Sequence, residues 1–309
     1  MEAENEPSSG SPGQTRAGTV ALVGYPNAGK SSLLNRFLDQ KLSIVTSAPQ
    51  TTRERVLGID TRDDVQIVFV DTPGLVDPRY LLHRAMLHSV LETIPDVDVA
   101  VLLLDPTSEN REFSEEVLEL LRRKRSSLLV VVNKTDVARR ERLRELREWA
   151  RETLGTDVLE VSAQSGEGVE ALRERIAELL PVSPFLYPPD EISSQPVRFF
   201  VAELIRETVF EQYGQEVPYS TTAKVDEFRE NADPLYIRAT IFVERPTQKA
   251  IVIGKGGAAI KKLGQAARLK VEEFVGAPVY LDLWVKVLPK WRKDPLSLAR
   301  LGFKLPTEP

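Results

Sequence analysis

Cysteine is absent from the 309 residues of this chain, and histidine occurs only twice, at His83 and His88. Without cysteine there are no disulfides and no zinc–thiolate sites, which fits a reducing compartment and predicts a cytoplasmic protein. The two histidines lie five residues apart in a segment that we expect to be helical, so they face different sides of the helix and make a poor pair of metal ligands. We expect both on the helix surface.

Long apolar runs are missing as well. No run approaches the ~20 residues that a membrane-spanning helix needs, and the first residues lack the basic, apolar and small-residue pattern of a secretory signal. Residues 1–17 are instead polar and contain proline and glycine. We therefore expect a disordered leader there.

The charge of the chain is unevenly distributed. Its formal net charge is −5, which argues against a protein that coats nucleic acid along its whole surface. Between Arg245 and Lys304, however, there are thirteen Lys and Arg residues and only four Asp and Glu residues, a surplus of nine positive charges. This asymmetry indicates either a polyanionic partner for the C-terminal part or a basic surface that is simply solvated.

The first half of the chain alternates between apolar runs and amphipathic segments. Continuous Val, Leu and Ile runs are typical of strands buried on both faces of a parallel sheet, and the segments between them have helical periodicity. The expected strands are 19–24, 65–71, 97–105, 127–133 and 157–162, and the expected helices are 30–39, 80–94, 113–124, 141–155 and 169–180. This alternation predicts an α/β domain with a mostly parallel sheet, helices on both faces, and ligand sites at the carboxyl ends of the strands.

The composition of the sequence changes after residue 180, where the last expected helix ends. We expect the α/β domain to cover residues 18–181, and the proline-rich residues 182–197 to form a linker. Residues 198–292 have the pattern of a small α+β domain, with a basic helix at 258–275, and are followed by a tail at 293–309.

The segment "GYPNAGKS" matches the pattern G-x-x-x-x-G-K-[ST], with Gly24, Gly29, Lys30 and Ser31 in the fixed positions. Small residues let backbone N–H groups turn toward phosphate oxygens, while the lysine charges the site and the serine hydroxyl binds Mg²⁺. The alternative is a plain strand–turn–helix connection, but the strand before the motif and the helix after it favour phosphate binding. The residues that we expect to contact a nucleotide here are Gly24, Tyr25, Pro26, Asn27, Ala28, Gly29, Lys30, Ser31 and Ser32.

The segment "NKTD" follows an expected strand and indicates which base is bound. Asp136 can accept hydrogen bonds from a ring N–H and an exocyclic amine, a pair that guanine offers and adenine lacks. Asn133 can meet the guanine edge, and the stem of Lys134 can cover the base plane. Four such residues alone also occur in ordinary polar loops, but "SAQSG" follows the next strand, where a backbone N–H of Ser162 or Ala163 can read the guanine oxygen.

The segment "DTPGL" ends another expected strand and predicts contacts with the metal and the last phosphate. Asp71 can reach Mg²⁺ through water, and the N–H of Gly74 can reach the γ-phosphate. Thr72, Pro73 and Leu75 complete the expected nucleotide-binding set of this segment.

A glycine-rich loop in the second domain predicts a contact with nucleic acid. A G-x-x-G loop at the start of a helix lets a nucleic-acid backbone approach closely, and the lysines around it add positive charge. Many ordinary helix starts look alike, and the "KAIVI" segment before the loop has strand propensity. Ile251, Ile253 and Ile260 are candidates for an apolar groove floor or for the core. The expected RNA-binding residues are Ile253, Gly254, Lys255, Gly256, Gly257, Lys261, Lys262 and Arg268.

Taken together, these motifs carry a family resemblance. Residues 19–180 resemble a translation-factor-type GTPase, and their combination with "QTTR" at 50–53, "PYS", "VIGKGG" and "LWVKV" resembles the Era family of bacterial GTPases, within the TrmE-Era-EngA class. The resemblance implies that the loop 42–55 is the first switch segment. It also implies that Thr52, or alternatively Thr51, binds Mg²⁺ together with Ser31 and Asp71 when GTP is bound.

For hydrolysis of GTP, the resemblance assigns catalysis to Lys30, Thr52, Gly74 and Asn27. Ras-type enzymes carry a water-orienting glutamine where this chain has Leu75, so either another element positions the water or hydrolysis is intrinsically slow. Asn27 resembles a loop asparagine that holds K⁺ in place of an arginine finger. Its alternative role is to stabilise the turn.

For the second domain, the resemblance implies a type II KH domain that binds the 3′ end of 16S ribosomal RNA. It further implies a role in maturation of the 30S ribosomal subunit and a peripheral association with the inner face of the cell membrane. The tail around Trp291 either extends the RNA contact or caps the domain. We expect a monomer by default.

The leading hypothesis is a GTP-operated RNA-binding switch. One rival is an adenine-dependent motor or kinase, which the "NKTD" segment argues against. The other is an RNA-binding module whose GTPase domain only acts as a scaffold, so that RNA affinity would not depend on the nucleotide.

Overall fold

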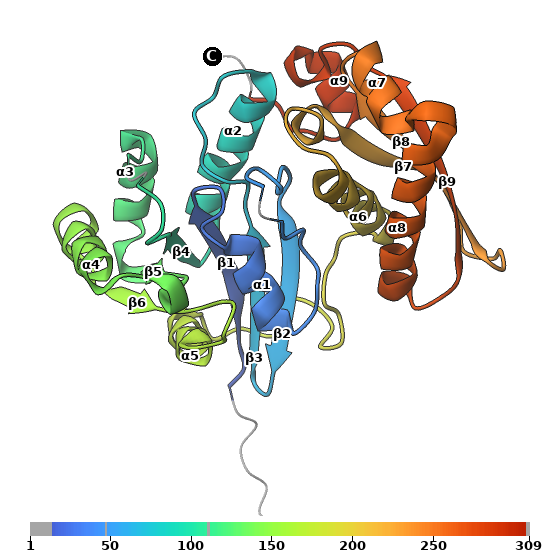
Figure 1. The fold of residues 1–309 in the computed structure, drawn as a ribbon. Helices are drawn as coiled ribbons and strands as arrows, with labels where there is room; N and C mark the ends of the chain where they lie inside the picture. The colour runs from blue at the N-terminus through green and yellow to red at the C-terminus, as the bar shows by residue number, and fades with distance from the viewer. Residues whose placement is uncertain (1–13, 47, 110–111, 307–309) are drawn as a thin grey trace, which may run out of the picture.

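The computed structural model describes residues 14–46, 48–109 and 112–306. In it, the chain forms two domains that lie side by side (Figure 1). Of the expected leader, residues 1–13 lie outside the described residues. The expected end of the leader at residue 17 is wrong, because strand β1 (Arg16–Gly24) begins at Arg16 and the residue before it is tied to the linker. The hydroxyl of Thr15 donates to the carbonyl of Ser183 at 2.8 Å, and the N–H of Ser183 donates to the carbonyl of Thr15 at 3.0 Å.

The first domain contains a six-stranded sheet with the order β2-β3-β1-β4-β5-β6. Its strands after β1 are β2 (Val56–Arg62), β3 (Val65–Asp71), β4 (Val99–Leu104), β5 (Leu128–Val132) and β6 (Val158–Glu160). All neighbours are parallel except the edge pair β2 and β3. The expected fold class is therefore confirmed, with one antiparallel edge strand that the sequence pattern did not reveal.

Helices cover both faces of this sheet. Their bounds are α1 (Lys30–Leu38), α2 (Leu81–Asp96), α3 (Glu115–Arg123), α4 (Arg140–Leu154) and α5 (Val169–Leu179). One apolar cluster lies under α1 and α5, and a second lies under α2, α3 and α4. The strands β1, β3, β4 and β5 are almost entirely buried as expected, β4 at every position, whereas β6 is only partly buried.

The sequence pattern did not predict the edge strand β2, because a glycine and polar residues interrupt its apolar residues. Gly58, Asp60 and Thr61 break the continuous apolar pattern that marks the central strands. Gly58 is required by packing, since a Cβ there would lie 2.6 Å from a methyl group of Leu34 on α1. The carboxylate of Asp60 accepts a 2.7 Å bond from Arg173 on α5.

The proline-rich linker lies along β2 instead of hanging free between the domains. The N–H of Ile59 donates to the carbonyl of Ile192 at 2.9 Å. The N–H of Leu57 donates to the side-chain oxygen of Gln195 at 2.9 Å, and the hydroxyl of Ser193 donates to the carbonyl of Leu57 at 2.6 Å. The linker thus covers hydrogen-bonding groups that an edge strand leaves open.

The second domain has the element order expected for a type II KH domain. It consists of α6 (Val197–Gln212), β7 (Thr222–Arg229), β8 (Leu235–Val243), α7 (Pro246–Ile253), α8 (Ala258–Val275) and β9 (Val279–Val287). The sheet order is β7-β8-β9, with β7 antiparallel and β9 parallel to β8. Val197 already belongs to α6, so the expected linker end at residue 197 is one residue too late.

None of the described helices is long and apolar enough to cross a membrane.

The helix α7 forms where "KAIVI" had strand propensity, so the KH pattern predicted this segment correctly. Pro246 occupies the first turn, where its missing N–H costs nothing. The side-chain oxygen of Gln248 accepts from the N–H groups of Glu244 and Arg245, both at 3.0 Å, which caps the helix start. Val252 is fully buried in the core of the domain. Tertiary packing and capping override the strand propensity here.

The C-terminal tail bridges the two domains. Its regular parts are a short 3₁₀ turn, Trp291–Lys293, and the helix α9 (Pro295–Arg300). Trp291 is fully buried and donates its ring N–H to the carbonyl of Ser220 at 2.9 Å. Together with Leu298 it packs against Leu82 and Met86 of α2. The buried ring of Trp291 itself caps the domain, and a contact between the rest of the tail and RNA stays a prediction.

Candidate nucleotide site and its contacts with the C-terminal domain

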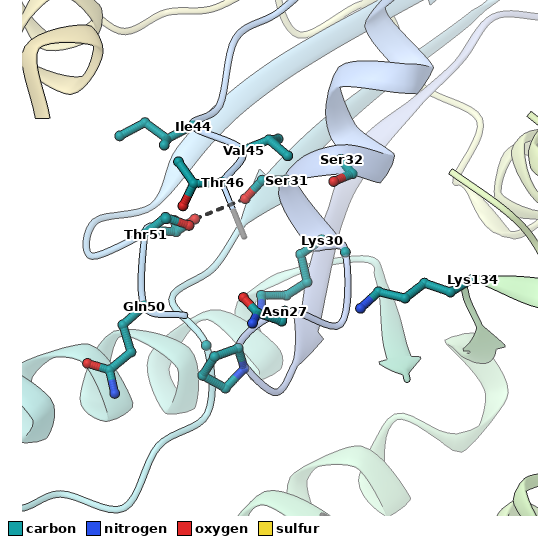
Figure 2. A pocket seen from close by; sticks show the side chains of 14 residues that line it. Asn27, Lys30, Ser31, Ser32, Ile44, Val45, Thr46, Gln50, Thr51 and Lys134 are labelled. Atoms are coloured by element: carbon teal, nitrogen blue, oxygen red, sulfur yellow. Dashed lines mark hydrogen bonds between the residues drawn. The ribbon is translucent and has the colours of Figure 1, made fainter. Parts of the chain in front are cut away.

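A cavity of about 340 Å³ lies at the start of α1, near the carboxyl end of β1, where a parallel sheet places its ligands. In Figure 2 the described residues of the first switch segment lie on one side of it and Lys134 lies on the other. Its lining combines the phosphate loop, the first switch segment and Gly74. The lining residues are Pro26, Asn27, Gly29, Lys30, Ser31, Ser32, Ile44, Val45, Thr46, Gln50, Thr51, Thr52, Gly74 and Lys134.

The loop before α1 has the backbone shape that an anion site needs. Gly29 has a φ of 92°, and a Cβ there would lie 2.0 Å from the amide nitrogen of Asn133, so only glycine fits. Asn27 also adopts a left-handed conformation, with a φ of 65°. The N-cap residue of α1 is Gly29, which has no side chain to cap the helix, so a phosphate can accept from the first N–H groups.

Lys30 is buried beneath this loop. Its ammonium donates to the carbonyls of Gly24 and Tyr25, both at 3.0 Å. Burial lowers the pKa of Lys30 to about 8, and the carboxylate of Asp71 opposes this shift. A negatively charged phosphate in the cavity would favour the protonated form of Lys30 further.

Three oxygen-bearing side chains expected to hold Mg²⁺ converge. The hydroxyl of Ser31 donates to Asp71 at 2.7 Å and lies 2.9 Å from the hydroxyl of Thr52. Asp71 is fully buried, burial raises its pKa, and its second carboxylate oxygen has no hydrogen-bond partner among the described residues. A buried carboxylate beside two hydroxyls suits the oxygen ligands that Mg²⁺ takes, so these residues fit the ion. Thr52, and not Thr51, bonds with Ser31.

Asn133 joins the phosphate loop to the "SAQSG" loop. It is buried, donates to the carbonyl of Ala28 at 2.9 Å, and accepts from the N–H of Ala163 at 3.0 Å. The N–H of Ala163 was expected to read the guanine oxygen, but in this structure it is bonded to Asn133. The contact of Asn133 with a base stays a prediction, whereas its positioning of both loops is seen directly.

The carboxylate of Asp136 is exposed and held in place by Ser162, whose hydroxyl donates to it at 2.6 Å. Lys134 has a left-handed backbone and pairs with Asp105 at 2.7 Å. The stem of Lys134 therefore borders the cavity while its charge is held near the end of β4. The cavity lining includes Lys134 but not Asp136, so the contact of Asp136 with a base stays a prediction.

Some expected site residues turn their side chains away from the cavity. The ring of Tyr25 packs on Phe113, and its hydroxyl donates to the carbonyl of Glu112. The hydroxyl of Thr72 donates to the carbonyl of Leu22 at 2.7 Å, in a fully buried position. Leu75 is buried in the core. Ala28 and Pro73 are also buried. Among these residues only backbone groups are in reach of a nucleotide.

The surface position expected for His83 is wrong. His83 is buried, its ring lies 3.9 Å from that of Tyr80 between centroids, and its Nε2 lies 3.2 Å from the side-chain oxygen of Gln50. The reason is that loop residues cover this position, since Gln50 and the carbonyl of Asp77 contact the ring nitrogens and Tyr80 packs on the ring. His88 is partly exposed and lies 3.3 Å from Glu92.

Arg53 connects the first switch segment to the second domain, and sequence reasoning missed this role. Its buried guanidinium donates to the carbonyls of Thr221 at 2.7 Å, Tyr219 at 3.0 Å and Pro218 at 3.2 Å. The same group lies 5.7 Å from the ring centroid of Trp291. The sequence signal that could have indicated this role is the position of Arg53 directly after Thr52 in the "QTTR" motif.

Glu207 makes a second connection between the same parts. This carboxylate on α6 is fully buried and pairs with Lys41 and with Lys270 of α8, both at 2.7 Å. It also accepts from the N–H of Val45 at 3.4 Å. The first switch segment is therefore attached to the second domain near both of its ends. Lys270, a basic residue of α8, serves this contact and is only partly exposed.

The glycine loop between α7 and α8 is open to a ligand. Gly256 and Gly257 have φ values of 60° and 80°, and a Cβ on either would meet no described atom within 4 Å. The basic side chains around the loop are exposed, namely Lys255, Lys261, Lys262 and Arg268. Ile251 is 49 % exposed, whereas Ile253 and Ile260 pack against the core of the domain. Of the three groove candidates, Ile251 is the one that faces solvent.

The convergence of Ser31, Thr52 and Asp71 predicts a selective effect of Thr52→Val, which keeps the side-chain volume and removes the hydroxyl. Affinity for a GTP analogue in Mg²⁺ is expected to fall about tenfold, because one polar contact worth about 1–3 kcal/mol is lost. GDP affinity is expected to stay unchanged, because the first switch segment is the part that meets the γ-phosphate. Isothermal titration calorimetry measures both.

Thr51→Val is the matched control for this measurement. Its hydroxyl lies one residue away and does not bond with Ser31 or Asp71, so the variant is expected to bind like the parent. Equal losses in the two variants, or a loss of GDP affinity as large as that of the GTP analogue, would contradict the assignment of Thr52.

Comparison with known proteins agrees with this geometry. A family model described as 50S ribosome-binding GTPase matches residues 19–134, and a KH domain model matches residues 216–292. GTPase Era of Bradyrhizobium diazoefficiens is 40 % identical over 305 residues, covering 98 % of this chain and 99 % of that protein. GTPase Era of Thermotoga maritima is 41 % identical over 293 residues, covering 94 % and 98 %.

Solved structures agree as well. A single-residue variant of Aquifex aeolicus Era bound to GDP and AlF₄⁻ superposes with a TM-score of 0.88 at 34 % identity, covering 94 % of this chain and all of that one. An Era complex with MgGDPNP and nucleotides 1506–1542 of 16S ribosomal RNA gives the same TM-score, identity and coverage. Both domains and their arrangement are therefore shared, and the chain belongs to the Era family of GTPases.

Proposed function

We propose that this chain is a GTP-hydrolysing switch that binds the 3′ end of 16S ribosomal RNA through its C-terminal domain and acts in assembly of the 30S subunit. The observation that carries the switch is the attachment of Arg53, next to Thr52, to backbone carbonyls of the second domain. The RNA target is supported by the Era structure that contains nucleotides 1506–1542 of 16S RNA.

In the G domain, catalysis rests on positioning and charge. The amides of the phosphate loop and of Gly74 would hold the phosphates, and Lys30 would place its charge on the β- and γ-phosphates. Mg²⁺, when bound by Ser31, Thr52 and Asp71, would neutralise developing charge on the phosphate oxygens. Leu75 lies in the core and its N–H donates to the carbonyl of Gly24 at 3.0 Å. Its side chain has no hydrogen-bonding group that could orient a water, so either another element positions the water or hydrolysis is intrinsically slow.

The switch works because the segment that meets the γ-phosphate also holds the second domain. GTP with Mg²⁺ would hold Thr52 where it already lies, beside Ser31, and would thereby keep Arg53 on the carbonyls to which it donates. Loss of the γ-phosphate releases both contacts together. Whether the first switch segment is ordered or disordered then determines where the glycine loop lies relative to the first domain.

Arg53→Ala is expected to uncouple RNA binding from the nucleotide. The parent should bind a 16S 3′-end RNA more tightly with a GTP analogue than with GDP, by a factor within the usual range of about 5- to 150-fold for coupling. In the variant this ratio is expected to approach one while nucleotide affinity is kept, because Arg53 does not line the cavity. Fluorescence anisotropy of labelled RNA measures the ratio.

The control is Arg55→Ala, since Arg55 donates to Thr93 within the first domain and should keep the parent's ratio. If the parent itself binds RNA equally with GTP, GDP or no nucleotide, the switch is wrong. The chain would then be an RNA-binding module with a scaffolding GTPase domain.

Asp136→Asn tests guanine selectivity. The parent should prefer guanosine over adenosine nucleotides, and the variant should lose about a hundredfold or more in GTP affinity, because two hydrogen bonds to a charged acceptor are disturbed. Xanthosine nucleotides, which carry an oxygen in place of the amine, should compete better in the variant. Asp157→Asn, an exposed carboxylate paired with Arg151, is the control. A parent that does not discriminate between the two bases would refute the site.

Asn27 and K⁺ form a further part of the proposal. Turnover is expected to be faster in K⁺ than in Na⁺, and Asn27→Gly, which tolerates the left-handed backbone, should remove only the K⁺ stimulation. Equal parent rates in the two salts would leave Asn27 as a turn residue.

Two expectations remain predictions. Peripheral association with the inner face of the cell membrane is implied by the resemblance alone, and flotation with anionic vesicles would test it. A monomer is the default, to be checked by light scattering.

A further inference from the structure

The outer face of the β7–β8–β9 sheet carries exposed aromatic rings. The helices α6, α7 and α8 pack on the other face, where Ile237, Ala239 and Ile241 are fully buried. On the open face, Tyr280 is 60 % exposed and Trp284 is 54 % exposed, both on β9. Rings this exposed contribute little to the core, so their position needs another explanation.

These rings form an ordered set across two strands. Tyr236 on β8 is paired in register with Tyr280 on β9, and their rings stack with centroids 5.8 Å apart. Asp282 accepts from the hydroxyl of Tyr236 at 3.2 Å and from the ring N–H of Trp284 at 3.0 Å. One carboxylate therefore holds a ring on each strand, and the face is organised before any ligand arrives.

Basic side chains border this aromatic face, together with the carboxylates of Asp226, Glu227 and Asp282. Arg229 lies 4.9 Å from the ring centroid of Tyr236, and Lys286 is exposed two residues after Trp284 on the same side of β9. The acidic residues of the face are engaged locally, since Asp226 accepts from Thr240 and Glu227 pairs with Arg229 and Arg238. Flat rings among basic groups are the composition of surfaces on which single-stranded nucleic acid stacks.

The face adjoins the expected RNA groove. The strand β9 is the edge strand of the sheet, and both α7 and α8, which flank the glycine loop, pack against it. In Figure 1 β9 lies on the outer side of the second domain, away from the first. Its inner face supports α8, where Gly264 lies over Leu283, and its outer face carries Tyr280 and Trp284. An RNA strand that passes over the edge of β9 would move from the groove to the rings.

We propose that Tyr280 and Trp284 form a second contact for single-stranded RNA, stacking on bases of the strand that leaves the glycine loop. The two residues are four positions apart on one strand, roughly 13 Å along it, so they stack on separate bases. This site rests on the proposed RNA binding of the second domain. It extends the footprint beyond the four or so nucleotides that a KH loop clamps, and it favours no base because every base has a flat face.

The test uses the full-length protein and an RNA of about the last 12 nucleotides of 16S ribosomal RNA, followed by anisotropy. The double variant Tyr280→Ala, Trp284→Ala is expected to lose at least about tenfold in affinity, because each stacked base is worth about this much. The double variant Tyr280→Phe, Trp284→Phe keeps the rings and should bind like the parent. Leu296→Ala removes an equally exposed apolar side chain from α9 and should have no effect.

A groove variant, Gly256→Asp, separates this proposal from the one on which it rests. Unchanged affinity in the alanine double variant, with a loss in Gly256→Asp, would overturn the aromatic contact and leave the groove intact. A loss in the alanine variant that phenylalanine does not restore would also overturn stacking. If the parent does not bind the RNA, both proposals fail. Binding that weakens in the alanine variant but not in Gly256→Asp would support the rings and refute the groove.

Discussion

The structure depends on the fact that Thr52 and Arg53 are neighbours in the chain. The hydroxyl of Thr52 lies 2.9 Å from that of Ser31, at the metal site. The guanidinium of Arg53 donates to three carbonyls of the second domain. Consecutive side chains share one backbone, so a displacement of the backbone at this point moves both contacts. The expected phosphate site and the position of the second domain are thereby linked through a single peptide bond.

The buried charges around Arg53 make the contact between the first switch segment and the second domain sensitive to small displacements. Burial raises the pKa of Glu54 to about 7 and lowers that of Arg53 to about 9, and burial also raises the pKa of Glu203. Arg206 pairs with Glu203 at 2.6 Å and donates to the carbonyl of Thr51. Buried charges are costly unless their partners stay in place. The interface is therefore held by geometry that a small displacement of the first switch segment can disturb.

Most of the architecture follows from local patterns, and the exceptions have identifiable causes. Central strands such as β4 are continuous apolar runs, and Lys30 and Ser31 belong to a motif whose spacing is fixed by phosphate geometry. The strand β2 was missed because Gly58 and Asp60 interrupt its apolar pattern. The roles of Arg53, Glu207 and Trp291 depend on hydrogen-bond partners that lie between 63 and 168 residues away, which no local pattern records. Burial of His83 was missed for a related reason, since its partner Gln50 comes from a loop 33 residues earlier in the chain.

The linker bonded along β2 determines how the second domain can move. Because Ile192, Ser193 and Gln195 are hydrogen-bonded to the sheet, the free chain between the domains is limited to the residues around Pro196. Because this free segment is short, the second domain would stay close to the first after their contacts break, which corresponds to a high effective concentration. Reorientation is then a swing about the sheet edge, and closure needs no diffusional search.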